Sequence, residues 1–360
     1  MPLSAILLTG KRPFSPTMGE SAGRQQGDAG PASFACVELF GQSILERTIL
    51  RLQQSGVRNI SVVASSMCVE FVAAKNVAVT IAAQPEDCWP IVERLFQNHV
   101  QRGTDTVLIA DLGAYVEFDV AKALQFHMAK RQAVTPLHDA HTSLSYWFVD
   151  ASQAMPSRTL AFPPDEDRMA DRPVPYLVDG YVNHLADGHD FRRLVVDVFF
   201  GRTSITPSGR EIKPGIWIDS GARVHKSVRL VGPVYIGRNT RVHPGAVISR
   251  CTSLERNCSV GQGSLIVNSS ILPHTIVGRG LDICAAVIDG SDFMHLHQNV
   301  VVRIEDPYLV SSAVSRPLQL PAYLPQYEGV DRRTEQLEVE YSQYLSRAAG
   351  RLLEVFKGQV

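Results

Sequence analysis

The chain has 360 residues, of which 45% are hydrophobic, and a formal net charge of −1 with no basic face visible in the sequence. This length allows two domains with full cores, and the balanced charge argues against nucleic-acid binding and against electrostatic attachment to membranes. The longest apolar stretches, such as Leu194–Phe200, are strand-length and too short to span a bilayer.

The cysteines and the N-terminus predict a cytoplasmic protein. The six cysteines form no CxxC motif and are not paired with histidines, so we interpret them as reduced packing residues and expect no structural zinc site. The chain enters an apolar strand at once, without a basic segment or a small-residue cleavage site, so we expect no signal peptide.

The first part of the chain alternates apolar strands with amphipathic helices. The pattern predicts strands over Ser4–Thr9, Asn59–Ala64, Ala78–Ala83 and Thr106–Ala110, and helices over Ser43–Gln54, Pro90–Gln101 and Phe118–Arg131. This order predicts a doubly wound α/β domain, with a mostly parallel sheet whose ligands lie beyond the carboxyl ends of the strands. That edge includes Asp111 and the Gly-, Ser- and Pro-rich segment Gly10–Ser33.

From Ile218 onward an aliphatic residue returns every six positions. A helix would scatter these residues, because six positions advance it by roughly 600°. Short strands joined by tight corners fit better, since turn formers such as Gly221, Asn239, Gly245, Asn257 and Gly263 recur before the small residue of each hexad. The aliphatic series is Ile218, Val224, Leu230, Ile236, Val242, Ile248, Leu254, Val260 and Ile266.

This rhythm resembles the hexapeptide-repeat, left-handed parallel β-helix family, in which three hexads form one turn and the aliphatic residue points inward. The phase slips by one residue at Ile271, resumes through Val277 and Ile283, and decays near Asp289. An antiparallel sandwich that happens to repeat in sixes is the alternative, although sandwich turns rarely recur so strictly.

The predicted domains are 1–200 (α/β), 201–305 (left-handed β-helix) and 306–360 (an extended segment and a C-terminal helix). The helix is expected over Arg333–Phe356, where one stripe of the sequence is apolar. The stripe predicts docking on the same chain or on another copy. We expect a homo-oligomer formed through the β-helix or this helix.

An α/β domain followed by such a β-helix resembles the nucleotide-sugar pyrophosphorylases, which make NDP-sugars from an NTP and a sugar 1-phosphate. In that family the first strand leads into a loop ending G-x-G-T-R-L-x-P, and a Pro-Lys pair follows. Here Gly10, Lys11 and Arg12 follow the first strand, but the second glycine and the threonine are absent. Aligning Phe40–Leu45 with the family's first helix places the Pro-Lys pair on Ser33 and Phe34, so the lysine is missing.

The resemblance also implies a site beyond this loop. Gln84 stands where the family's base-recognition loop Q-x-x-x-G-T-A begins, but the G-T-A is absent. Val107–Asp111 resembles the family's apolar strand that ends in a magnesium-binding aspartate, and Asn183 is the candidate second ligand for Mg²⁺. Lys11 and Arg12 would act on the phosphates, and Gly10 and Gln84 would contact the nucleotide. A turn or helix cap is the plain interpretation of Asp111 and Asn183, and a solvated loop charge that of Lys11 and Arg12.

The missing lysine decides the expected activity, because removing one preorganised phosphate-binding charge typically costs about a hundred- to a thousandfold in rate. We expect a diverged pyrophosphorylase-like protein that binds an NTP or NDP-sugar, with transfer to a sugar 1-phosphate weak or lost. A non-catalytic nucleotide-sugar-binding regulator or scaffold is the first alternative. A hexapeptide-repeat acyltransferase is the second, with His225, His243 or His274 as general base, although the same histidines fit ordinary surface positions of the β-helix.

Overall fold

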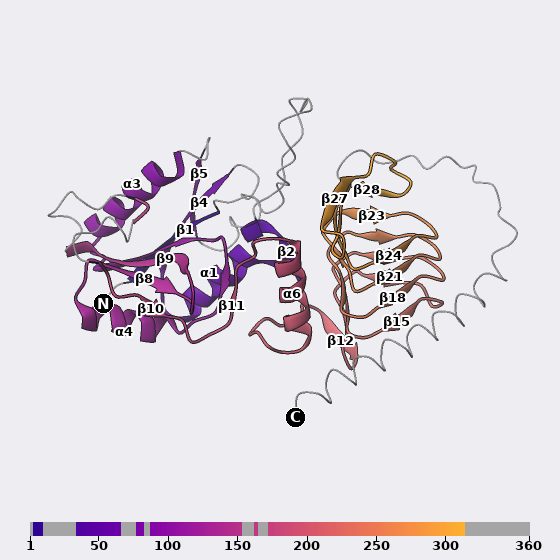
Figure 1. Ribbon diagram of the computed structural model, residues 1–360, viewed down its shortest axis with the longest axis horizontal. Coiled ribbons are helices and arrows are strands. Elements are labelled where there is room, and N and C mark those ends of the chain that lie inside the picture. The colour runs from indigo at the N-terminus through magenta and orange to yellow at the C-terminus, as the bar shows by residue number, and fades with distance from the viewer. Residues whose placement is uncertain are drawn as a thin grey trace, which may run out of the picture. The chain divides into compact units, whose positions relative to one another are not determined.

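The N-terminal half of the chain forms a seven-stranded sheet in the order β10-β8-β9-β6-β1-β4-β5 (Figure 1). The computed structural model describes residues 3–9, 34–65, 77–82, 87–152, 162–164 and 172–313. The strands are β1 Leu3–Leu8, β4 Asn59–Ser65, β5 Ala78–Ala82, β6 Thr106–Asp111, β8 Val134–His138, β9 Ser143–Asp150 and β10 Tyr176–Leu177.

Most neighbours in this sheet are parallel. β1 pairs in parallel with β4 and β6, β4 with β5, and β10 with β8, whereas β9 runs antiparallel to both β6 and β8. A tight turn makes this reversal possible, because the Asp139 carboxylate accepts hydrogen bonds from the backbone N–H groups of His141 and Thr142, both at 2.7 Å. The predicted parallel-rich α/β sheet is therefore present, with one antiparallel strand that the sequence pattern did not indicate.

Helices cover both faces of the sheet, as Figure 1 shows for α3 on one side and α1 and α4 on the other. Ala5 and Leu7 of β1 belong to the core beneath α1 and α4, whereas Ile6 and Leu8 belong to the core beneath α3. This alternation follows from the two-residue period of a strand. The helices are α1 Ile44–Gln54, α3 Cys88–Gln101 and α4 Val120–Lys130, so the strands and helices predicted between Ser4 and Arg131 are confirmed.

The apolar stretch Leu194–Phe200 lies mostly in the end of α6 (Gly188–Phe199), whose Asp187 cap accepts a hydrogen bond from the Asp190 N–H at 2.9 Å. Cys36 is disulfide-bonded, so the prediction of six reduced cysteines is wrong. Within those ranges, no helix has both the length and the apolar character needed to cross a membrane.

The second half of the described chain forms three stacked sheets of short strands, which we call the stacked-sheet region. From β13 to β22 every strand pairs in parallel with the third strand after it, an arrangement compatible with a β-helix. The bounds of the strands are β12 Arg210–Lys213, β13 Ile216–Ile218, β14 Arg223–Val224, β15 Arg229–Val231, β16 Val234–Ile236, β17 Arg241–Val242, β18 Val247–Ser249, β19 Thr252–Leu254, β20 Ser259–Val260, β21 Leu265–Val267, β22 Ser270–Ile271, β23 Thr275–Val277, β24 Asp282–Cys284, β25 Ala286–Asp289, β26 Asp292–His295, β27 Val300–Arg303 and β28 Val310–Ser312.

The register of these strands reproduces the sequence repeat. Val234 pairs with Thr252, and Thr240 and Cys258 at the same corner of neighbouring layers are also 18 positions apart. The step shortens to 17 positions at Ser253 and Ser270. The predicted slip of one residue near Ile271 is confirmed.

The aliphatic series points into the stacked-sheet region. From Ile236 to Ile266 all of its members are buried, whereas Ile218, Val224 and Leu230 in the first layer are partly exposed. Smaller hydroxyl side chains share this interior and bond backbone carbonyls: Thr240 Oγ1 donates to Glu255 O at 2.6 Å and Ser264 Oγ to Gly278 O at 2.7 Å. These bonds satisfy polar groups that would otherwise be costly to bury.

The corners use the residues that the sequence pattern identified as turn formers. Gly221, Asn239, Gly245, Asn257 and Gly263 all have positive φ, between 56° and 73°. Asparagine and glycine adopt this conformation at low cost. After β25 the parallel pairing ends and β25, β26 and β27 form an antiparallel ribbon, which agrees with the decay of the repeat near Asp289.

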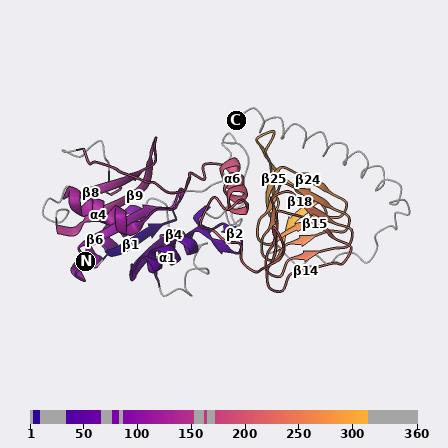
Figure 2. The same ribbon diagram turned by 90° about the horizontal axis from the view of Figure 1, so that it is seen from below.

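One apolar cluster joins the segment that leads into α1, α6 and the stacked-sheet region. It includes Phe40, Phe191 of α6, Tyr235 of β16 and Leu272, and Figure 2 shows α6 beside the strands of the stacked-sheet region. The Arg192 guanidinium, on a residue only 4% exposed, donates hydrogen bonds to Ser270 Oγ, Cys251 O and Asn268 Oδ1. The segment before α1, together with α6, therefore shares a buried junction with the stacked-sheet region.

Candidate functional site

The carboxyl ends of β1 and β6 lie side by side in the centre of the sheet. Leu8 pairs with Asp111, and Leu112 N–H donates to Leu8 O at 2.9 Å. Asp111 is half-buried at the last position of β6. Its carboxylate therefore lies at the edge where a parallel α/β sheet places its ligands.

Two hydroxyl side chains, those of Tyr146 and Thr9, belong to the strand positions around Asp111. Tyr146 lies across from Ala110 in β9, and burial, reinforced by the Asp111 charge, raises the pKa of the Tyr146 hydroxyl above its usual range. Thr9, at the point where the chain leaves β1, is 4% exposed, and its Oγ1 has no hydrogen-bond partner among the described residues. Buried hydroxyls are usually paired.

The loop residues that the resemblance assigns to the nucleotide lie outside the described residues. Gly10, Lys11 and Arg12 directly follow Thr9, and Gln84 belongs to the segment between β5 and α3. Only the attachment points of both segments are described. Asp111 is thus the predicted site residue whose position at the carboxyl edge is defined.

Asn183 has a local structural role in β11 (Val182–Asn183), which pairs with β7 (Tyr115–Val116). Its side chain is fully buried; Nδ2 donates to Asp190 O at 2.9 Å and Oδ1 accepts from Leu185 N–H at 3.0 Å. The amide thereby fixes the turn that leads into α6. A role as a metal ligand would compete with the bond from Leu185.

The fit of a magnesium ion rests on Asp111. The parts of the chain that the structure describes contain no group of three or more His, Cys, Asp or Glu side chains able to hold a metal ion. Mg²⁺ commonly uses one or two carboxylates and completes its shell with water and substrate phosphates. Asp111 fits the role of a single carboxylate ligand for an ion that a nucleotide brings with it. Asn183 fits the role of a second ligand less well, because both ends of its amide are already hydrogen-bonded.

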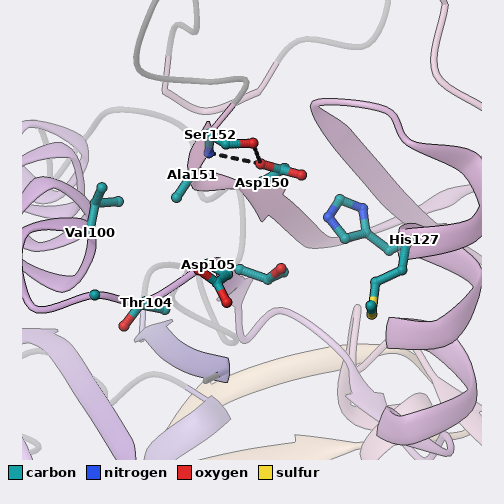
Figure 3. Close-up of a pocket in the computed structure, with 10 residues that line it drawn as sticks. Val100, Thr104, Asp105, His127, Asp150, Ala151 and Ser152 are labelled. Atoms are coloured by element: carbon teal, nitrogen blue, oxygen red, sulfur yellow. Dashed lines mark hydrogen bonds between the residues drawn. The ribbon is translucent and has the colours of Figure 1, made fainter. Parts of the chain in front are cut away.

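A depression lies at the opposite edge of the sheet, near the start of β6. Figure 3 shows His127 of α4 pointing toward Asp150 across a depression of about 570 Å³. His127 Nδ1 is 2.7 Å from Thr135 Oγ1, and Asp150 Oδ1 accepts from Ser152 Oγ at 2.6 Å. Burial lowers the pKa of the His127 imidazole, and the Asp150 charge opposes this effect. No sequence motif marked this depression, because its residues come from α3, β6, α4 and β9 and from the segments that adjoin them.

The three histidines of the stacked-sheet region that would serve an acyltransferase have ordinary neighbours. His225 is exposed, with Nδ1 2.8 Å from Ser227 Oγ. His243 Nε2 is 3.4 Å from Ser259 Oγ, and His274 occupies a corner with φ of 63°. The strands continue from β13 to β22 without a long inserted loop, and the segment that returns to the corner at His274 contains β28, with Ala313 N–H donating to His274 O at 2.6 Å.

Comparison with known proteins gives one partial similarity. No protein-family model matches the chain. A UTP–glucose-1-phosphate uridylyltransferase from Synechocystis sp. is 28% identical over 83 residues, which cover 23% of this chain and 21% of that protein. The matched segment therefore spans about a fifth of the relative's length, and it supports at most a loose relation to the nucleotide-sugar pyrophosphorylases.

Proposed function

We propose that this protein is a diverged nucleotide-sugar pyrophosphorylase-like protein that binds an NTP or an NDP-sugar at the carboxyl edge of its α/β sheet. The position of Asp111, at the end of β6 and opposite Leu8, carries the proposal, because this is the edge where such sheets bind ligands. The partial similarity to a uridylyltransferase supports it. The 18-residue step supports the further proposal that the stacked-sheet region is a left-handed hexapeptide-repeat β-helix.

Each site residue would have a distinct role. Asp111 would hold a Mg²⁺ ion on the phosphates, Arg12 and Lys11 would neutralise the triphosphate, and Gly10 and Gln84 would contact the nucleotide backbone and base. If the protein is active, a sugar 1-phosphate attacks the α-phosphorus in line and pyrophosphate leaves toward Arg12.

Catalysis is proposed to be weak or lost because the loop lacks the family's lysine and second glycine. Phe34 occupies the place of that lysine, and one such charge is typically worth about a hundred- to a thousandfold in rate. Binding requires less than catalysis, since a ligand need not be held in the geometry of a transition state. A binding protein that acts as a nucleotide-sugar sensor is therefore part of the same proposal.

The test is a thermal-shift panel of NTPs, NDP-sugars and acyl-CoAs, each with and without Mg²⁺. A ligand at about a hundred times its dissociation constant should add about 2.7 kcal/mol to the free energy of unfolding. Asp111→Ala should abolish a magnesium-dependent shift, whereas Asp105→Ala, at the other end of the same strand, should preserve it. If no nucleotide or NDP-sugar produces a shift, the proposal is wrong, and a shift with acyl-CoA alone would favour an acyltransferase.

A further inference from the structure

The turn between β2 (Glu38–Leu39) and β3 (Gln42–Ser43) is the part of the α/β sheet domain that enters the junction. Phe40 and Gly41 form this turn with φ angles of 52° and 84°. Ser208 N–H donates to Phe40 O at 3.2 Å. Ser43 then caps α1 in a reciprocal pair of hydrogen bonds with Glu46, so the turn leads directly into the first helix.

A buried glutamate of the stacked-sheet region holds this turn from the other side. Glu255, which follows β19, is fully buried. Its Oε1 accepts a hydrogen bond from Phe40 N–H at 3.0 Å, and its Oε2 accepts one from Gly41 N–H at 3.2 Å. A single carboxyl group thus bonds two successive backbone donors that are more than 200 positions away in the chain.

A second carboxylate lies in the same cluster. Glu38 is 8% exposed and is paired with Arg256, whose Nε is 2.5 Å from Glu38 Oε2. The other nearby arginine, Arg47, uses Nη2 to donate to Leu39 O at 2.7 Å and to Phe40 O at 3.3 Å. One arginine is therefore committed to Glu38 and the other to backbone carbonyls.

This arrangement disfavours a charge on Glu255. Removing a carboxylate from water is costly, and a second carboxylate nearby adds repulsion. Burial and then the Glu38 charge raise the pKa of Glu255 to about 8, against the opposing effects of the Phe40 and Gly41 bonds and of Arg47. Burial also raises the pKa of Glu38, although Arg256 opposes that shift.

The other charged or titratable groups near this cluster have partners or distinct roles. Glu46 is occupied by the α1 cap, and Asp219 accepts a hydrogen bond from Ser208 Oγ at 2.7 Å. Among the described residues, the groups that act on Glu255 or on its direct neighbours include Glu38 from β2, Glu46 and Arg47 from α1, Tyr115 from β7, Tyr235 from β16, and Asp219, Arg238, Arg256, Cys258 and His274 from the stacked-sheet region.

We propose that docking of the Phe40–Gly41 turn on the stacked-sheet region is a proton-dependent contact that is made with Glu255 protonated and weakens as the pH rises. A released turn exposes Glu255 to water, where its ordinary pKa favours the charged form. Docking therefore takes up one proton. It is favoured at low pH and is lost as the pH rises toward the pKa of the buried Glu255. The contact is made by residues of the junction alone, whether or not a nucleotide binds at Asp111.

Amide hydrogen exchange of Phe40 and Gly41 in the full-length protein tests the proposal, because both amides donate to Glu255. The measured quantity is the protection factor, the intrinsic exchange rate at each pH divided by the observed rate. One linked proton predicts a fall of up to about tenfold per pH unit between about pH 6 and pH 8. In Glu255→Gln the protection factor should be lower than that of the wild type at pH 6 and should not change with pH. Glu305→Gln, at an exposed position, should behave as the wild type.

Three results would overturn the proposal: a wild-type protection factor that does not change with pH, a Glu255→Gln variant that keeps the wild-type slope, or a Glu305→Gln variant that loses it. Glu38→Gln gives a second test if Glu255→Gln fails to fold. It removes the repelling carboxylate and the ion pair that Glu38 forms with Arg256, and both changes favour a charged Glu255. The fall in protection should therefore move to lower pH, and an unchanged position would contradict the proposal.

Discussion

Arg192 of α6 and Asn268 of the stacked-sheet region are joined by a hydrogen bond of 2.8 Å from Nη2 to Oδ1, although 76 positions separate them in the chain. The same guanidinium also reaches Cys251 O and Ser270 Oγ, and burial lowers its pKa to about 10. Three acceptors around one buried charge repay part of its desolvation. This side chain therefore fastens α6 to the corners of neighbouring layers.

Replacing Arg192 by alanine should lower the free energy of unfolding by about 3 kcal/mol, because it leaves buried acceptors without donors. Urea denaturation measures the change. The matched control is Arg193→Ala on the same helix, because the Arg193 side chain is exposed and its ion pair with the half-buried Asp190 should contribute less than about 1 kcal/mol. Equal losses in the two variants would show that Arg192 does not anchor the helix.

Gly41→Ala should destabilise the protein more than Gly56→Ala. Both glycines have positive φ, 84° and 89°, so both variants incur a backbone cost of about 1–2 kcal/mol. An added Cβ at Gly41 would also lie 2.9 Å from the Tyr235 hydroxyl and closer still to Ser208 Oγ, whereas at Gly56 it would meet no atom within 4 Å. The comparison is made by thermal unfolding, and a larger loss for Gly56→Ala would contradict the packing described at the junction.

Truncation of the inward series should show the difference between the first and the inner layers. Ile248 is fully buried and Leu230 is partly exposed. Ile248→Ala should therefore lower the free energy of unfolding by about 2–5 kcal/mol. Leu230→Ala should lower it by about 1 kcal/mol, because it removes less buried apolar area and leaves a smaller cavity. Chemical denaturation distinguishes them. Similar costs at both positions would mean that the repeat does not define one continuous core.

Asp139 predicts a loss of stability in acid. Hydrogen bonds from the His141 and Thr142 N–H groups, followed by the bond to His184, hold the pKa of Asp139 well below its usual range. A lowered pKa gives a contribution that is present above the unfolded value and is lost as the pH falls. The stability difference between wild type and Asp139→Ala, about 1 kcal/mol near neutral pH, should therefore shrink as the pH is lowered below about 4. A stability difference that grows in acid would contradict a lowered pKa of Asp139.

The repeat made the stacked-sheet region predictable in detail, because each hexad places one aliphatic residue inside and one turn former at a corner. The shortened step at Ser270 and the positive φ of Asn239 and Asn257 both follow from the spacing of residues in the sequence. The prediction of the α/β domain was less complete. Its parallel strands and amphipathic helices have clear periods, but the reversal at Asp139 depends on a side chain that caps its own turn.

The junction could not be predicted, because its contacts join residues far apart in the chain. Nothing local distinguishes Glu255 or Arg192 from surface charges; their burial arises only when the Phe40–Gly41 turn and α6 dock. For the site, sequence resemblance indicated Asp111, and the pairing of β6 with β1 defined its neighbours. The local bonds of Asn183 likewise required the structure.

The most direct test of the central proposal is the location of nucleotide protection. Amide hydrogen exchange would be measured with and without UTP and Mg²⁺, over the carboxyl ends of β1 and β6 and over the depression formed by Thr104–Thr106 and Asp150–Ser152. We predict that UTP and Mg²⁺ slow exchange from Leu8 to Thr9 and from Asp111 to Gly113. In Asp111→Ala they should have no effect on these amides. Slower exchange at the depression alone, or no change at either edge, would contradict nucleotide binding at Asp111.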